Sequence, residues 1–150
     1  MEKSTFVYVT YIRTTPEKLW AKLTETEVPR EFFFATTLHA SEWKVGAKWN
    51  STAPDGTLVD GGEVLEVDPP KRMVLRWHHE MRPEHTAEGD SRATYELEQN
   101  EGMVKLTVIH EMDRGQSKFI EAVSNGWPTI LSSLKSLLET GEALEDTRTW

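Results

Sequence analysis

Residues 116–140 read QSKFIEAVSNGWPTILSSLKSLLET, and this stretch is the strongest indication of the fold. Its apolar residues recur every three or four positions, the spacing of one buried face of an α-helix. Gly141 suits the position after the end of such a helix, whereas Pro128 predicts a kink or a local opening near Ser124. A helix of about 24 residues is about 36 Å long, enough to cross a whole sheet.

The residues before this helix predict antiparallel strands. Between residues 37 and 111, β-rich runs at 58–67, 72–79, 91–98 and 103–111 alternate with turn sequences. The turns contain combinations such as Pro54-Asp55-Gly56, in which proline comes early and glycine late. The last two runs alternate apolar and polar residues, which indicates a sheet with one covered face and one wet face.

The N-terminal part predicts a first strand at residues 5–13, covered on both faces, and then two short helices. Thr15 can cap the first helix and Pro16 suits its first turn; the second is expected from about Val28 to Phe34. The order of elements indicates an α+β fold, in which a curved antiparallel sheet of about six strands surrounds the long C-terminal helix. Residues 1–141 are expected to form a single domain, and residues 142–150 a loosely ordered tail.

Composition excludes several classes of function. The chain has 150 residues, a formal net charge of -8 and no cysteine. The acidic balance argues against a nucleic-acid partner, and the lack of cysteine excludes disulfides and thiolate metal sites and fits a reducing compartment. No signal sequence and no apolar run of about 20 residues is present, so no membrane span is predicted and a cytoplasmic location is expected.

One helix on a curved sheet cannot fill the space at both ends, so a cavity is expected between them. Large aromatic side chains with polar tips can either fill or line such a cavity. The candidate ligand-binding residues are Trp20, Phe33, Trp49, Trp77, His79, Tyr95, His110, Phe119, Val123, Trp127 and Ile130. Trp127, beside Gly126 and Pro128, either packs against the sheet or belongs to a flexible point that gates the cavity.

The other motifs do not predict a catalytic site. His78 and His79 are adjacent on a strand and point to opposite faces, so no metal site and no cofactor is expected. His110 is interpreted as a core histidine with satisfied hydrogen bonds rather than a general base. The paired glycines at 61 and 62 favour a bulge or tight bend over a phosphate loop. No nucleophile elbow or dinucleotide motif is present.

Several stretches together resemble a known family. They are TTPEKLWAKLT (14–24), EWKVGAKW (42–49), PDGTLVDGGEVLEVDPPKRMVLRW (54–77), SRATYELE (91–98), VKLTVIHE (104–111) and GWPTILSSLKSLLETG (126–141). They are similar to the activator of Hsp90 ATPase homologue 1-like (AHSA1-like) family of the START-like, or SRPBCC, superfamily. The resemblance implies a helix-grip fold of the START/Bet v 1 type with a deep hydrophobic cavity.

The resemblance and the residues together favour non-catalytic binding of a small hydrophobic molecule, either lipid-like or aromatic and polyketide-like. Two alternatives stay open. One is an enzyme of the cyclase or hydrolase kind that uses the same cavity. The other is a protein-interaction module associated with a chaperone and so with the stress response. The chain is expected to be a monomer or a homodimer.

Overall fold

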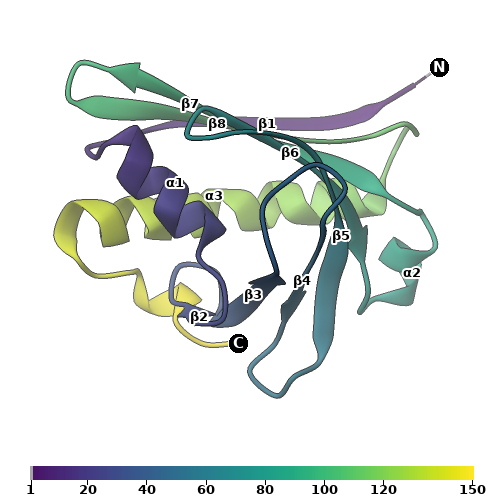
Figure 1. The fold of residues 1–150 in the computed structure, drawn as a ribbon. Helices are drawn as coiled ribbons and strands as arrows, with labels where there is room; N and C mark the ends of the chain where they lie inside the picture. The colour runs from purple at the N-terminus through teal and green to yellow at the C-terminus, as the bar shows by residue number, and fades with distance from the viewer. Residues whose placement is uncertain (1) are drawn as a thin grey trace.

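The computed structural model describes residues 2–150, which form one curved sheet around a long helix (Figure 1). The elements are β1 (Ser4–Ile12), α1 (Pro16–Thr24), β2 (Pro29–Arg30), β3 (Thr36–Ala40), β4 (Lys48–Thr52), β5 (Leu58–Asp68), β6 (Arg72–His79), α2 (Pro83–Thr86), β7 (Ser91–Asn100), β8 (Met103–Met112), α3 (Lys118–Thr140) and a 3-10 turn at Glu145–Thr147. The eight strands lie in the order β1-β8-β7-β6-β5-β4-β3-β2, and each neighbouring pair is antiparallel. The predicted α+β fold with a curved antiparallel sheet and a long C-terminal helix is therefore confirmed.

The number of strands and one short helix differ from the prediction. The sheet has eight strands rather than about six, and the second short helix, expected from Val28 to Phe34, is absent. Its place is taken by β2 and a tight turn in which Phe34 and Ala35 have positive φ angles of 55° and 59°. The buried Arg30 holds this turn, because its carbonyl accepts from the N–H of Ala35 and its guanidinium donates to Thr36 Oγ1 at 2.8 Å.

The first strand is covered on one face only. Val7 and Val9 on β1 are 54% and 44% exposed, contrary to the expectation of cover on both sides. The strand lies at the edge of the sheet, and its alternate residues project from the convex side, where no second layer packs. The first helix follows the prediction: Thr15 caps it by accepting from the N–H of Lys18 at 3.2 Å, and Leu19 and Leu23 are buried.

The hairpin of β5 and β6 changes register along its length. Asp68 pairs with Arg72 near the turn, but the register shifts by one residue around Leu65, so that Asp60 pairs with His79. The extra residue is a β-bulge, which bends and twists the strand that carries it. A bulge was expected at Gly61-Gly62, but the bulge between β5 and β6 lies at Leu65. A second register shift, between β4 and β5, lies at Ser51/Thr52.

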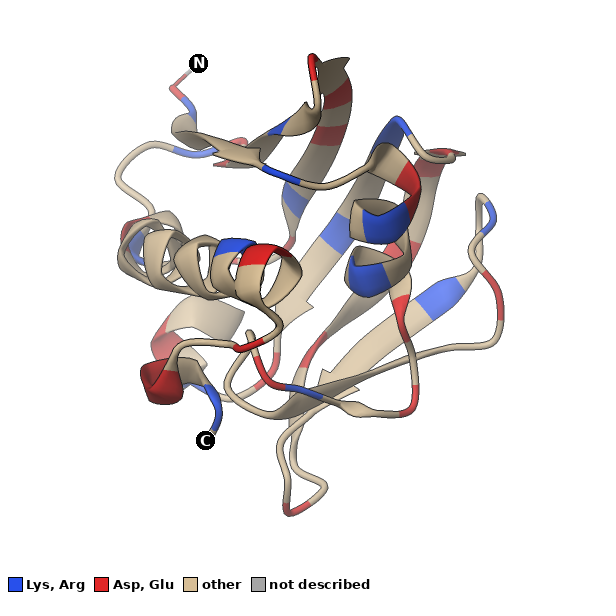
Figure 2. Cartoon of the chain, turned by 90° about the vertical axis from the view of Figure 1, so that its left-hand side faces the viewer, with Lys and Arg blue, Asp and Glu red and all other residues tan. Residues whose placement is uncertain are grey.

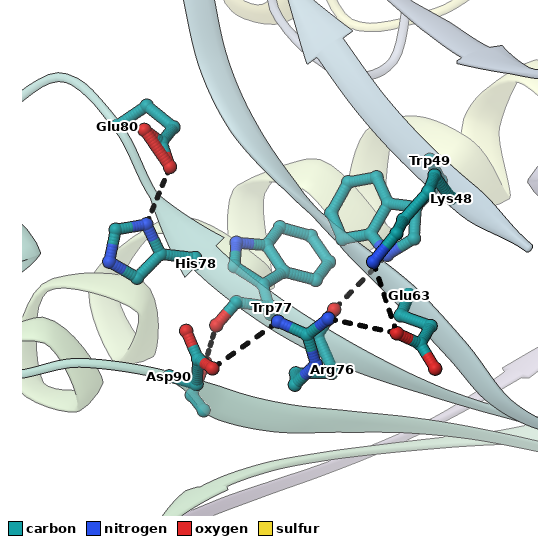
Figure 3. A network of polar contacts seen from close by, with 9 residues as sticks. Lys48, Trp49, Glu63, Arg76, Trp77, His78, Glu80 and Asp90 are labelled. Carbon is teal, nitrogen blue, oxygen red and sulfur yellow. Dashed lines mark hydrogen bonds and ion pairs between the residues drawn. The ribbon is translucent and has the colours of Figure 1, made fainter. Parts of the chain in front are cut away.

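Gly62 has a different role, which is to permit a close approach. A Cβ atom at this position would collide with the main-chain carbonyl of Arg76, whereas one at Gly61 would meet its nearest atom at 3.4 Å. The same Arg76 carbonyl accepts from Trp49 Nε1 at 3.1 Å, so that the Trp49 indole lies close over Gly62. Figure 3 shows this contact, with the Arg76 guanidinium between Glu63 and Asp90 on the outer face.

Both ends of α3 are held by side chains. At its start, Ser117 accepts from the N–H of Ile120, and Glu88 accepts from the N–H groups of Lys118 and Phe119. Partial burial acts to raise the pKa of Glu88, but the hydrogen bonds from Ser117, Lys118 and Phe119 outweigh it and leave that pKa below its usual value. The loop around α2 thus supplies an acidic cap where a helix has free N–H groups and positive charge.

The segment after α3 also makes specific contacts. Gly141 ends the helix with φ of 88°. Thr147 is buried; its Oγ1 lies 2.7 Å from the carbonyl of Glu31, to which it donates, and 2.6 Å from Ser133 Oγ. Residues 142–150, for which a loosely ordered tail was expected, are therefore anchored through Thr147 to both α3 and the turn after β2.

Acidic and basic residues are interspersed along the strands and helices, as the coloured cartoon in Figure 2 shows. Among the helices of residues 2–150, none combines the length and the apolar character that crossing a membrane requires.

Candidate functional site

A cleft of about 410 Å³ lies between the first part of α3 and the ends of β5 and β6. Its other walls are α2 and the turn after β2. Aromatic and aliphatic side chains predominate in its lining. The lining residues are Phe33, Phe34, Asp60, Trp77, His79, Arg82, His85, Phe119, Ala122, Val123, Gly126, Trp127 and Ile130.

The periodicities of strand and helix place these side chains. Trp77 and His79 are two residues apart on β6 and so share its inner face, while His78 between them points outward. Phe119, Val123, Trp127 and Ile130 follow at three- and four-residue spacing along α3. Gly126 lies on the same side, and a Cβ atom there would have no neighbour within 4 Å, so this glycine leaves the cleft open.

Several of the candidate residues meet in this cleft: Phe33, Trp77, His79, Phe119, Val123, Trp127 and Ile130. Trp20, Trp49, Tyr95 and His110 do not line it. Trp49 and Tyr95 border a separate void of only about 10 Å³, which is at the lower limit for one water molecule. Trp20 is partly buried against the core. Whether any of these residues binds a ligand stays a prediction.

His110 is a core histidine with both ring nitrogens partnered. Trp127 Nε1 donates to His110 Nδ1 at 3.1 Å, so the His110 proton is on Nε2, which lies 2.8 Å from Ser91 Oγ. The ring is completely buried, and burial lowers the pKa of His110 to about 3. His110 is therefore neutral at physiological pH, and it orients the Trp127 indole.

Trp127 serves both the core and the cleft. Its ring packs edge-on against Phe33, Trp77 and Tyr95, with centroids about 6 Å apart. It is almost fully buried, yet it also forms part of the cleft wall. Pro128 lies inside α3, which is assigned as one helix from Lys118 to Thr140, and a gating motion at that point stays a prediction.

The cleft also contains an ionisable pair made of the buried Asp60 and the partly buried His79. His79 Nδ1 lies 2.9 Å from Asp60 Oδ1, and the Asp60 residue is only 7% exposed. Because a carboxylate is an acceptor, Nδ1 carries the proton that it donates to Asp60. His79 Nε2, at the far end of the ring, is buried and has no hydrogen-bond partner within residues 2–150.

Trp77 presents a second unpaired group. Its Nε1, a donor only, is likewise buried without an acceptor among the described residues. Most buried polar groups in proteins are hydrogen-bonded, so two such exceptions on one strand face require an explanation. Both belong to side chains that line the cleft.

A buried cation lies behind the turn that forms one wall. The Arg30 guanidinium lies over the Phe33 ring, 4.2 Å from its centroid, and donates to Thr36. Burial lowers the pKa of Arg30 to about 10, so this side chain stays charged at neutral pH. It supports the Phe33 ring from the side opposite the cleft through a cation–π contact.

Sequence reasoning missed the lining residues Phe34, Asp60, Arg82, His85, Ala122 and Gly126. Ala122 and Gly126 lie one helical turn apart, beside Val123 and Trp127, so the helical period could have placed both of them at the cleft. The position of Asp60 opposite His79 could not be predicted, because it depends on the bulge at Leu65. A straight hairpin from the Asp68–Arg72 pair would place Gly61, not Asp60, opposite His79.

The described residues 2–150 contain no group of three or more histidine, aspartate or glutamate side chains arranged to hold a metal ion. His78 and His79 turn to opposite faces of the sheet. Figure 3 shows His78 beside Glu80 on the outer side, whereas His79 pairs with Asp60 on the inner side.

Comparison with solved structures finds the same fold in several bacterial proteins. Protein MLL2253 from Mesorhizobium loti is 26% identical, with a TM-score of 0.73 over 91% of this chain and 97% of that chain. The Aha1 dimer from Colwellia psychrerythraea is 20% identical, with a TM-score of 0.71 over 92% and 98% of the two chains. DynU16, from the dynemicin biosynthetic locus, is 19% identical, with a TM-score of 0.70 over 94% of this chain and 50% of that chain.

A comparison with curated proteins gave no match. The family described as "Activator of Hsp90 ATPase homolog 1-like protein" matches residues 13–139, which is most of the chain. That range runs from the end of β1 to the end of α3 and includes every lining residue of the cleft. The chain therefore belongs to the activator of Hsp90 ATPase homolog 1-like family.

Proposed function

We propose that this protein binds a small, largely apolar molecule, lipid-like or aromatic, in the cleft between the sheet and α3, without changing it chemically. The observation that carries the proposal is the cleft itself. Its volume of about 410 Å³ falls in the range of about 300–1,000 Å³ that is typical of small-molecule sites. Burial of apolar ligand surface would supply the affinity, at about 25 cal/mol per Å².

The lining supports binding rather than catalysis. It contains no serine, threonine, cysteine or lysine that could serve as a nucleophile. Its rings form a rigid wall, since Trp127 is fixed through His110 and Phe33 is supported by Arg30. A protein of the same fold lies in the dynemicin biosynthetic locus, which is compatible with an aromatic ligand.

The test is a direct search for bound and binding molecules. Native mass spectrometry of gently purified protein would reveal a co-purified ligand. Fluorescence titration with palmitate and with 8-anilinonaphthalene-1-sulfonate would report binding, because Trp77 and Trp127 line the cleft. We expect saturable binding at micromolar concentrations, and Gly126→Phe should abolish it by filling the cleft. Binding of neither probe, and no co-purified ligand, would contradict the proposal.

One observation favours a second candidate, an enzyme that uses the same cleft. The Asp60–His79 pair has the arrangement of an oriented general base, with Nδ1–H on the carboxylate and Nε2 free to take a proton. A hydrolase of this kind would activate water directly. Hydrolysis of p-nitrophenyl butyrate that exceeds the buffer rate and is lost in His79→Asn would support this candidate, whereas no turnover would leave binding as the function.

A further inference from the structure

We infer that the cleft selects ligands that carry a hydroxyl group on an apolar ring, with His79 Nε2 accepting the hydroxyl proton and Trp77 Nε1 donating to a ligand oxygen. This inference rests on the proposed function and specifies its substrate class. It is carried by two buried polar atoms that the protein itself leaves unpaired.

The state of His79 follows from its partner. Asp60 is buried beside it on the paired strand and accepts the Nδ1 proton at 2.9 Å. In the neutral ring the other nitrogen is then an acceptor and not a donor. In this neutral form, a histidine held by a carboxylate offers one acceptor, and the ligand brings the proton.

The His79 ring is packed among other rings of the cleft lining. The His79 ring packs against Phe119 and His85, with centroids 5.6 and 5.5 Å away. An apolar ring entering the cleft would lie against the same side chains, and its hydroxyl meets Nε2 when these rings part, because that atom is shielded in the unliganded protein. An ether at the same position keeps the ligand's shape and its acceptor but leaves Nε2 unpaired, which is unfavourable in a buried site.

Trp77 supplies a hydrogen-bond donor, which complements the acceptor of His79. Residues two apart on a strand are separated by about 6–7 Å, so His79 and Trp77 project from neighbouring inner positions of β6, and both side chains line the cleft. A hydroxylated bicyclic aromatic can satisfy the first with its proton and approach the second with an oxygen. A purely aliphatic lipid tail satisfies neither.

The experiment compares 2-naphthol with 2-methoxynaphthalene by isothermal titration calorimetry. We expect wild-type protein to bind the naphthol about fivefold to tenfold more tightly, the effect of one net hydrogen bond. His79→Asn keeps an amide N–H for Asp60 but has no atom at the Nε2 position, so it should bind both compounds equally. Trp77→Phe should weaken both compounds together, because both retain an oxygen acceptor.

The matched control is His78→Asn. His78 is the neighbouring residue, pairs with Glu80 in the same way, and faces outward; its substitution should leave the naphthol preference intact. Equal binding of the two compounds by wild-type protein, or a preference that survives in His79→Asn, would overturn the inference while leaving the cleft as a binding site. Binding of neither compound would overturn the proposed function together with the inference.

Discussion

Substitution of Gly126 separates the roles of cleft and core. Gly126 lies within α3 and lines the cleft, and a Cβ atom at this position would meet nothing within 4 Å. Glycine in a helix interior costs about 1 kcal/mol relative to alanine. Gly126→Ala should therefore raise the free energy of unfolding by about 1 kcal/mol, which corresponds to about 2–4 °C in Tm for a chain of this size.

Gly126→Phe places a large side chain at the same position, and this side chain should fill part of the cleft. Its ring would occupy the space beside Val123 and Trp127 where a ligand is expected to lie. We expect the stability of this variant to equal or exceed that of the wild type, because phenylalanine is a better helix former than glycine. Binding of 2-naphthol should weaken by about tenfold or more, since the ligand loses the apolar surface that it would bury.

Differential scanning calorimetry measures the first effect and isothermal titration calorimetry the second, on wild-type protein, Gly126→Ala and Gly126→Phe. The alanine variant is the control, because it stabilises the helix without blocking the cleft. A lower Tm for Gly126→Ala would mean that other atoms occupy this space and that the cleft is closed. Unchanged naphthol affinity in Gly126→Phe would mean that the ligand binds elsewhere.

Three further predictions concern the core. The pKa of His110 is lowered to about 3 from about 6.5 in the unfolded chain, so the free energy of unfolding should fall as the pH falls from about 6.5 toward 3, by at most about 1.4 kcal/mol per pH unit. Urea unfolding between pH 4 and 7 should show a weaker dependence of stability on pH for His110→Gln than for wild-type protein. The same dependence in both proteins would refute this prediction. Gly62→Ala should destabilise by about 3 kcal/mol or more through collision with the Arg76 carbonyl, and Gly61→Ala only slightly; equal unfolding midpoints would contradict this. Trp127→Phe leaves His110 Nδ1 without its donor and should cost about 1–3 kcal/mol in chemical denaturation, with no loss if that hydrogen bond is absent.

Periodicity predicted the parts of the fold that depend on one buried face. The apolar spacing from Phe119 to Leu138 located α3, and alternation located β7 and β8. The turn after β2 follows a different rule. A second short helix was expected from about Val28 to Phe34, but the chain reverses there, and the buried Arg30 holds the turn by donating to Thr36. A contact of this kind between a buried cation and a turn leaves no periodic signal in the sequence.

The candidate site was predictable to the extent that it lies on regular elements. Trp77, His79 and the α3 residues could be assigned to inner faces by counting along a strand or helix. Asp60 could not, because its position opposite His79 depends on one extra residue at Leu65. Trp49 and Tyr95 were candidates for the cavity lining, but they border only a separate void of about 10 Å³. Which inner positions are filled and which are hollow depends on three-dimensional packing that local pattern does not encode.

The anchoring of α3 at both ends limits how the protein can admit a ligand. Glu88 binds the main chain at the start of the helix, and Ser133 and Thr147 tie its second half to the turn after β2. A hinged movement of the whole helix away from the sheet would break all of these contacts together. We therefore expect a ligand to enter through the open side of the cleft, with side chains at its rim such as Arg82 turning aside, and to exchange while the helix stays in place.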